Sequence, residues 1–214
     1  TLLLRSSNIT WTSLLALSEY WLSLEMLNIG YIPNIPTADI ARRCSHALSC
    51  IRHLHTNHLI GQDANVLLPY MTGLTSVYLK YYCHSYIPLL AQHCHKLTKI
   101  TVYNRNYTAA DILSLCRTNP LLEELWGCIN KYFIDTTLIE LIHACPHLHT
   151  LYLPYETDIT DIGILALSKH CFQLQVLLIY KSHKITEAAV LQLLQRCRKL
   201  TRLDVSSSSL SVEA

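Results

Sequence analysis

Apolar positions recur along the chain in a fixed pattern of short leucine-containing segments. The clearest copy is residues 171–179, Cys-Phe-Gln-Leu-Gln-Val-Leu-Leu-Ile, which reads C-x-x-L-x-x-L-x-I. The same pattern returns at residues 145–153 and 197–205, so that three copies stand 26 residues apart. A fixed period in this range is the signature of a repeat architecture. The pattern therefore predicts a chain of similar, stacked units.

The first leucine of the pattern can be followed through most of the chain. Successive copies are separated by 23 to 26 residues, within the 20–29 typical of leucine-rich repeats. They begin at Leu24, Leu48, Leu74, Leu97, Leu122, Leu148, Leu174 and Leu200. The segment Leu2-Leu3-Leu4 corresponds to the strand of a truncated unit. We expect residues 1–214 to form a single leucine-rich-repeat domain of about eight repeats plus a partial N-terminal one, as a fragment of a longer array.

Each repeat is expected to contain a short strand, a connection and a helix. The L-x-L segment alternates with period two, which is typical of a strand. The stretch that follows has helical period, and in residues 160–171 it begins with Thr160 as N-cap and Asp161 in the first turn. Thr108 and Asp111 have the spacing of a capping box. Stacking such units predicts an α/β solenoid, a horseshoe with a concave parallel sheet and outer helices.

The pattern weakens toward the N-terminus, and the local register is open there. Aligned on Leu48, the second repeat places Arg52 at the middle outward position and His53 where a core leucine is expected. In the repeat that contains Trp126, Gly127 takes that core place.

Residues 145–163 resemble the cysteine-containing class of leucine-rich repeat, with the pattern C-x-x-L-x-x-L-x-L and then I-T-D-x-G. Residues 159–163, Ile-Thr-Asp-Ile-Gly, match the end of that pattern. The resemblance covers nearly the whole chain and implies a ribonuclease-inhibitor-like horseshoe. Its familiar members are F-box/leucine-rich-repeat proteins, whose solenoid presents substrates to a cullin-type ubiquitin ligase, and other members are scaffolds without that link. The chain departs from the pattern after the strand, where Glu156 and Ser182 replace the class cysteine, and no F-box is recognisable in it.

Composition narrows the possible partners. Hydrophobic residues make up 50% of the chain and charged residues only 15%, against about a quarter in an average protein. The net charge is +2 and the lysines and arginines are scattered, which gives no support for a nucleic-acid partner. No apolar run approaches the ~20 residues of a membrane span. We therefore expect protein partners.

Six of the nine cysteines recur at one point of the repeat, the end of the predicted helix. They are Cys44, Cys94, Cys116, Cys145, Cys171 and Cys197. A metal ladder and stacked disulfides are the functional alternatives, but one thiol per repeat does not place four ligands around a point. Free cysteine packs like a small apolar residue. We expect core packing, no metal or cofactor, and a reducing intracellular compartment, the cytoplasm.

Other motifs offer few candidates for chemistry. His53, His55 and His58 are the place where a metal site would be expected if one exists, although two or three histidines need further ligands. There is no glycine-rich phosphate loop or G-x-S-x-G motif, so no catalytic residue is assigned and the chain is not expected to be an enzyme. The sequons at Asn8 and Asn106 would be used only in a secreted recognition module, which is a third possibility.

The outward-facing strand positions are the candidate functional residues. Core leucines point inward, so the residues between them line the concave face, and tryptophan, tyrosine and arginine there are typical of interface hot spots. The candidate protein-binding residues are Arg52, Tyr78, Lys80, Tyr103, Trp126, Tyr152, Leu178 and Tyr180. The alternative is that these aromatic side chains pack against one another along the sheet.

The sequence thus leads to two functional hypotheses. The first is a non-enzymatic protein-binding scaffold or adaptor, with a ubiquitin-ligase substrate receptor as its specific form. The second is a structural subunit permanently built into a large multiprotein assembly, which the low charge content favours.

Overall fold

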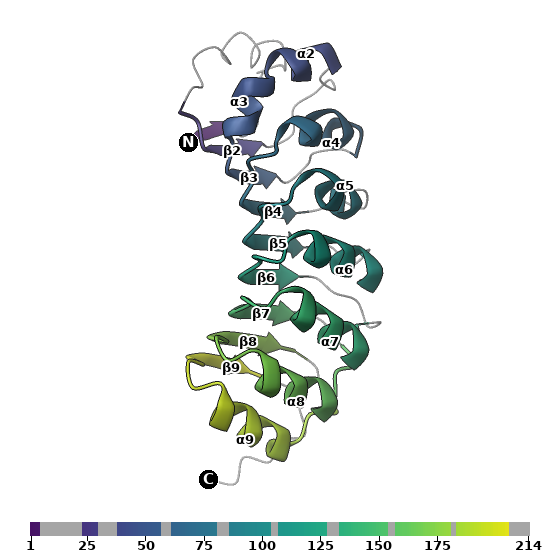
Figure 1. Cartoon of the computed structure of the whole chain (residues 1–214), viewed down its shortest axis with the longest axis vertical. Coiled ribbons are helices and arrows are strands. Elements are labelled where there is room, and N and C mark those ends of the chain that lie inside the picture. The colour runs from purple at the N-terminus through teal and green to yellow at the C-terminus, as the bar shows by residue number, and fades with distance from the viewer. Residues whose placement is uncertain are drawn as a thin grey trace. The chain divides into compact units, whose positions relative to one another are not determined.

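A computed structural model describes residues 1–4, 23–29, 38–56, 61–80, 86–103, 107–127, 133–153, 157–180 and 183–205. The chain divides into two units, Thr1–Asn104 and Arg105–Ala214, and each is taken separately. Within each unit short strands lie side by side in one layer and helices in a second layer (Figure 1).

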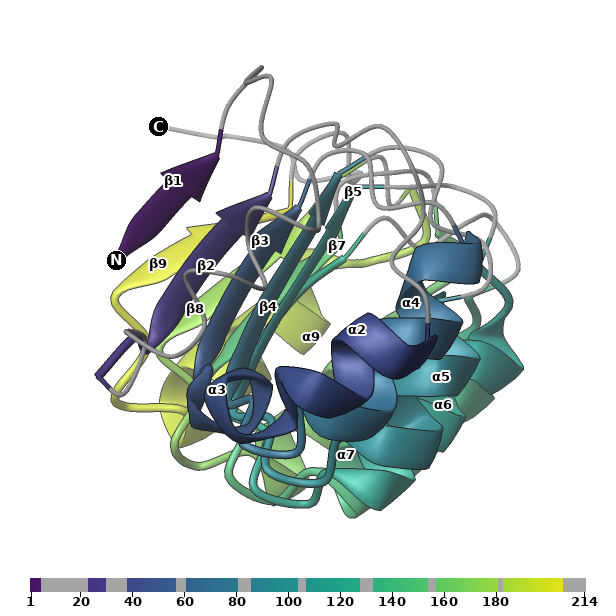
Figure 2. The same ribbon diagram turned by 90° about the horizontal axis from the view of Figure 1, so that it is seen from above.

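The first unit contains a parallel sheet in which strands are ordered as in the chain. Its described strands are β1 (Leu2–Leu4), β2 (Met26–Ile29), β3 (His53–Thr56), β4 (Ser76–Lys80) and β5 (Lys99–Tyr103). Its described helices are α2 (Ala38–Arg43), α3 (Ser45–Cys50), α4 (Gly61–Leu67), the 3-10 turn η1 (Leu68–Tyr70) and α5 (Tyr86–His93). The view from above shows these helices beside one face of the strands (Figure 2).

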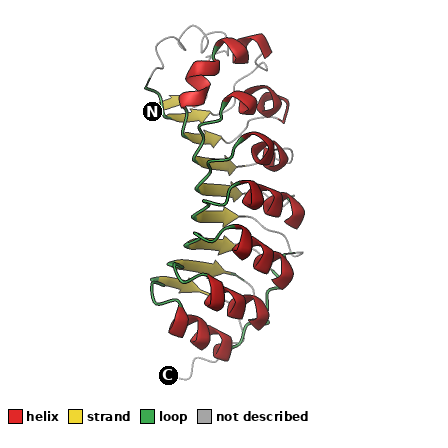
Figure 3. Cartoon of the chain, in the orientation of Figure 1, coloured by secondary structure: helices red, strands yellow, loops and turns green. Residues whose placement is uncertain are grey.

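The second unit repeats the same alternation more regularly (Figure 3). Its described helices are α6 (Ala109–Thr118), α7 (Asp135–Ala144), α8 (Asp161–His170) and α9 (Glu187–Arg196). Its strands are β6 (Glu124–Gly127), β7 (Thr150–Leu153), β8 (Val176–Ile179) and β9 (Arg202–Asp204), each parallel to the next. The predicted strand–loop–helix unit is confirmed in both parts of the chain.

The core lies between the strand and helix layers of each unit. In β4 the side chains alternate, with Val77 and Leu79 buried and the residues between them half-buried. Leu151 on β7 and Leu138 and Leu141 on α7 are fully buried, as the period-two and helical patterns require. Burial of each such side chain stabilises the fold by about 1.5–3 kcal/mol.

The predicted helix caps are confirmed at two positions. Asp111 N–H donates to Thr108 Oγ1 (3.1 Å) and Thr108 N–H to Asp111 Oδ2 (2.9 Å), which completes the capping box of α6. Thr160 Oγ1 accepts from Ile162 N–H at 3.2 Å at the start of α8. Thr186 precedes α9 without such a bond.

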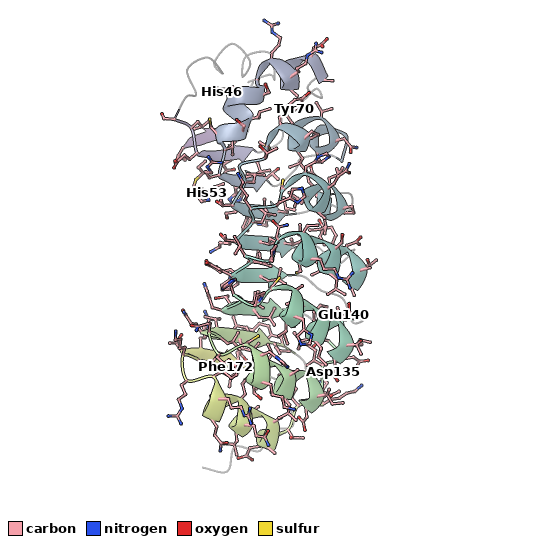
Figure 4. The ribbon with its side chains drawn as sticks, in the orientation of Figure 1. His46, His53, Tyr70, Asp135, Glu140 and Phe172 are labelled. Carbon is pink, nitrogen blue, oxygen red and sulfur yellow. The ribbon has the colours of Figure 1, made fainter. Side chains whose placement is uncertain are left out.

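Two carboxylates link consecutive repeats of the second unit. Asp135, at the start of α7 (Figure 4), accepts from Thr160 N–H (2.9 Å) and from Thr160 Oγ1 (2.6 Å). Asp161, 26 residues later, accepts from the N–H and the hydroxyl of Thr186, both at 2.7 Å. The acidic residue of the helix first turn therefore also joins its repeat to the next one.

The glycine of the I-T-D-x-G motif has a steric reason. Gly163 N–H donates to Asp135 Oδ1 at 3.0 Å. A Cβ atom at residue 163 would stand 2.6 Å from that same oxygen and 3.0 Å from side-chain carbons of Ile159 and Leu138. Only glycine allows the backbone to approach the carboxylate this closely.

The predicted register of the second repeat is wrong. Leu48 belongs to α3, and Ile51, which is fully buried, takes the anchor position. Leu54 then pairs in register with Leu27 and Val77 and is buried. The leucine at 48 fits the spacing equally well, but the chain forms a second short helix there and the strand starts three residues later.

Candidate functional site

The candidate site is the strand face, by which we mean the outward side of the strands opposite the buried leucines. On β4 it carries Ser76, Tyr78 and Lys80, all half-buried. On β6 it carries Glu124 and Trp126, also half-buried. Tyr78, Lys80 and Trp126 therefore lie where the alternation predicts them.

Arg52 does not belong to the strand face, which corrects the sequence-based expectation. It precedes β3 and is exposed, and its Nη1 donates to the Gly73 carbonyl oxygen at 3.0 Å. A Cβ atom at Gly73 would overlap the Arg52 guanidinium and the Ser49 carbonyl, so this glycine leaves room for the arginine. Arg52 ties the helix-to-strand turn to the next repeat.

In the observed register His55, and not Arg52, occupies the middle outward position of β3. It pairs in register with Asn28 on one side and Tyr78 on the other. The sequence signal that could have found it is the apolar pair Ile51 and Leu54, which has the same three-residue spacing as Leu74 and Val77. His55 is half-buried.

The aromatic side chains of the first unit form a continuous row, the first-unit strip, made of His55, Tyr78 and Tyr103. The ring centroids of His55 and Tyr78 are 4.0 Å apart, and those of Tyr78 and Tyr103 are 5.6 Å apart. Tyr103 is 39% exposed. The half-buried lysines Lys80 and Lys99 lie on the same face, Lys80 in register with Tyr103.

A second row, the second-unit strip, consists of Trp126, Tyr152 and Tyr180. The Trp126 and Tyr152 centroids are 5.4 Å apart and those of Tyr152 and Tyr180 are 5.7 Å apart, both edge-to-face. All three side chains are half-buried. Edge-to-face pairs at this separation hold rings in defined orientations. The aromatic residues thus pack along the sheet, as the alternative expected, and keep part of their surface exposed.

Carboxylates hold both ends of the second-unit strip. Trp126 Nε1 donates to Glu124 Oε2 at 3.0 Å. The Tyr180 hydroxyl donates to the Asp204 carboxylate, and this hydrogen bond raises the pKa of Tyr180 because ionisation would break it and place two negative charges together. Arg202 nearby acts in the opposite direction on that pKa.

Leu178 is buried, with 2% of its surface exposed, and this corrects its assignment as a contact residue. It stands in the middle of β8, in register with Tyr152 and Asp204, and Tyr180 follows on the same face. Directly opposite side chains on adjacent strands are close enough to contact one another, and Tyr152 is larger than the leucine beside it. Leu178 therefore packs beside the rings of the second-unit strip and is not exposed to a partner.

The recurring cysteines are packed in the core. The six predicted residues are all buried and carry free thiols. Burial raises the pKa of Cys94 to about 12, and burial together with nearby thiols raises that of Cys171 to about 12. Cys197 Sγ lies 3.4 Å from the Cys171 carbonyl oxygen of the preceding repeat. This geometry agrees with the expected packing role.

The histidine motif is only partly described. His53 and His55 project to the same side of β3 and are half-buried, while His58 lies outside the described residues. Within the described ranges no group of three or more His, Cys, Asp or Glu side chains is placed to hold a metal ion. The sequons at Asn8 and Asn106 also lie outside these ranges.

Among the helices that the structure describes, none has the length and apolar content needed to cross a bilayer.

Comparison with known proteins supports the fold. No family model matches the chain, and no curated protein matches it by sequence. The chain is similar to the crystal structure of the Rad7 and Elc1 complex in yeast, with a TM-score of 0.54 and 14% identity over 93% of this chain and 64% of that one. It is also similar to the TLR13–ssRNA13 complex, with a TM-score of 0.50 and 16% identity over 89% of this chain and 33% of that one.

These neighbours are leucine-rich-repeat structures, and with the strand–helix repeats they establish the fold class. The protein is an α/β leucine-rich-repeat solenoid. The chain spans slightly under two thirds of the length of the first of these neighbours and about one third of the second.

Proposed function

We propose that the protein is a non-enzymatic scaffold that binds protein partners on its strand face. The observation that carries this proposal is the pair of aromatic strips, whose rings contact one another along the strands yet remain partly exposed. Tyrosine and tryptophan in rigid, partly exposed positions contribute most to protein interfaces. The leucine-rich-repeat neighbours support a binding role, and one of them is a complex between proteins, Rad7 and Elc1.

The test compares two double variants of the chain as bait. Trp126→Ala with Tyr152→Ala removes the second-unit strip, and Leu121→Ala with Phe172→Ala removes two side chains that are 57% and 55% exposed elsewhere. Quantitative proteomics should find partners that the wild type and the Leu121/Phe172 variant retain and the Trp126/Tyr152 variant loses. Equal retention by a folded Trp126/Tyr152 variant, checked by circular dichroism, would sink the proposal.

A more specific form of this function is a substrate receptor for a cullin-type ubiquitin ligase. Its support is the resemblance to the cysteine-containing repeat class, in which Cys145, Cys171 and Cys197 recur with the expected spacing and are buried. Immunoprecipitation of the full-length protein should recover a cullin. Absence of cullin from a preparation that contains the strand-face partners would exclude this form and leave the scaffold role intact.

One observation favours the alternative, a structural subunit of a large assembly. On α9, Leu191 and Leu194 are 49% and 46% exposed. The residues equivalent to Leu194 in the two preceding repeats are Ser168 on α8 and Ile142 on α7. They are only 1% and 2% exposed. In the second unit α7 packs beside α8 and α8 beside α9, so the exposed face of α9 fits another amphipathic helix of the same kind.

Size measurement separates the two functions. A permanently assembled subunit should elute from gel filtration of a cell extract only at the size of its complex. An adaptor should show a substantial pool of free chain, and that pool would exclude the structural-subunit alternative.

A further inference from the structure

We propose that two copies of the chain associate end to end, with α9 of one copy packed antiparallel against α9 of the other. This inference goes beyond the proposed binding on the strand face and does not depend on it. It names a second copy of the chain as the occupant of the exposed side of α9. Two features of the last repeat carry it, the order of side chains along α9 and the incomplete burial of the repeat.

One side of α9 carries an exposed row of two leucines between two opposite charges. We call this row the α9 stripe, and it consists of Glu187, Leu191, Leu194 and Arg198. The successive spacings of four, three and four residues place these side chains on one side of a helix. Leu191 and Leu194 are about half exposed, and both charged residues are exposed. The two leucines and Arg198 line one open groove, so Arg198 continues the stripe just beyond the end of the helix.

The two charged ends of the α9 stripe are too far apart for a direct ion pair within one copy. Glu187 and Arg198 are separated by eleven residues, or about 16 Å along a helix at ~1.5 Å per residue. No salt bridge within the described residues involves either of them. Each charge therefore remains available to a group on another molecule.

The α9 stripe is complementary to a reversed copy of itself. In an antiparallel pair of α9 helices, the first turn of one helix lies beside the last turn of the other. Glu187 of each copy then faces Arg198 of the other copy, while Leu191 of each faces Leu194 of the other. A parallel pair would place like charges together, which disfavours association. An unrelated partner helix requires no such symmetry in the stripe, so the stripe favours a second copy.

The strand side of the last repeat is also less covered than in the repeats before it. Leu200 and Leu203 are half-buried, whereas the equivalent Leu174 and Leu177 are fully buried. β9 pairs with β8, and no strand in the described part of the chain lies along its other edge (Figure 1). An edge strand presents backbone groups that pair readily with another strand. The last repeat therefore offers a strand edge together with the exposed side of α9.

A single twofold axis brings both of these surfaces into contact. An axis that runs from the strand layer to the helix layer at the end of the second unit reverses the direction of each strand and helix and keeps each layer in place. It brings α9 against α9 of the other copy and β9 against β9 of the other copy, both antiparallel. Such a contact uses the same patch on both copies and closes at the dimer.

Analytical ultracentrifugation at micromolar protein concentration tests the proposal. The wild type should sediment as a dimer, at twice the 24.5 kDa mass of the chain. Glu187→Arg brings two arginines together at each end of the stripe, and Arg198→Glu brings two glutamates together. Each variant should raise the dissociation constant of the dimer about tenfold or more. An equimolar mixture of the two variants restores both contacts between opposite charges and should sediment as a heterodimer.

Two controls accompany these variants. Arg43→Glu reverses an exposed charge on α2 in the first unit and should dimerise as the wild type does. Circular dichroism should find all the charge variants folded, because the replaced side chains are exposed.

The outcomes separate this inference from the proposed function. A monomeric wild type would contradict the inference and give the α9 stripe another occupant, such as residues 206–214 or an unrelated helix. A dimer that both single variants retain, or a mixture of them that stays monomeric, would contradict the antiparallel contact. Trp126→Ala with Tyr152→Ala should leave the dimer intact, so its effect on partner capture is read independently of dimerisation.

Discussion

At the scale of single residues, the repeat motif serves packing more than chemistry. Cys94 and Cys171 are buried where helix passes to strand, and their pKa values are raised to about 12. The thiolate is the reactive form of cysteine. These residues therefore hold neutral, unreactive thiols at neutral pH.

Alkylation measures this directly. With iodoacetamide at pH 8, we expect Cys94 and Cys171 to remain unlabelled in the native chain, because a thiol with a pKa of about 12 is almost entirely protonated there. Cys50, which is half-buried, should react first, and all three should react in urea. Peptide mass spectrometry reads the result, and native labelling of Cys171 as fast as Cys50 would contradict it.

At the scale of elements, the first residues of α7 and α8 each have two roles. Asp135 and Asp161 favour the helix by lying at its positive end, and they also accept hydrogen bonds from the threonine of the following repeat. One repeat earlier, the corresponding positions are Ala109 and Ile134, which provide neither carboxylate nor hydroxyl. The link is therefore a property of particular repeats.

Replacing Asp135 with asparagine tests the link. The variant keeps the shape but loses the charge that accepts from Thr160 and from Gly163, so we expect the free energy of unfolding to fall by about 1–3 kcal/mol. Asp158→Asn breaks an exposed ion pair of 2.9 Å and should cost about 0–1 kcal/mol. Urea titrations compare the two, and equal losses would show that the link adds nothing.

The revised register of β3 has its own test. Leu54 is 2% exposed and pairs with core positions on both sides, so Leu54→Ala should lower the free energy of unfolding by about 2–5 kcal/mol. His53 is half-buried on the outward side, and His53→Ala should have a much smaller effect. If the histidine variant is the more destabilised of the two in urea titration, the register first expected from the sequence would be restored.

At the scale of the whole molecule, the regular repeats explain how much the sequence could predict. From Leu122 to Leu200 the spacing is constant, and the pattern alone predicts the strands, the Thr160 cap and the buried cysteines there. The pattern failed at Arg52 because Leu48 and Ile51 can both be aligned with the first leucine of the repeat. Only the structure, in which Leu48 belongs to the extra helix α3, shows that Ile51 is the equivalent residue. It failed at Leu178 because an outward position does not guarantee exposure: Leu178 is 2% exposed, with Tyr152 in register beside it and Tyr180 two residues further along the strand.

The contacts within the site are less predictable from the sequence than the fold is. Alternation places Tyr78, Trp126 and Tyr152 on the outward side, but it does not say which rings touch or which carboxylate receives a ring donor. Those features depend on side-chain conformation across neighbouring strands. The aromatic strips and the Glu124 hydrogen bond therefore emerge only from the structure.

Hydroxyl-radical footprinting of the chain with and without a captured partner tests the central claim most directly. Oxidation of Trp126, Tyr152 and Tyr180 should fall severalfold in the complex, because the partner covers their exposed surface. Phe172, 55% exposed on the turn that leads to β8, should oxidise at the same rate in both states (Figure 4). Protection of Phe172 with unchanged oxidation of Trp126, Tyr152, Tyr78 and Tyr103 would show that the partner binds elsewhere.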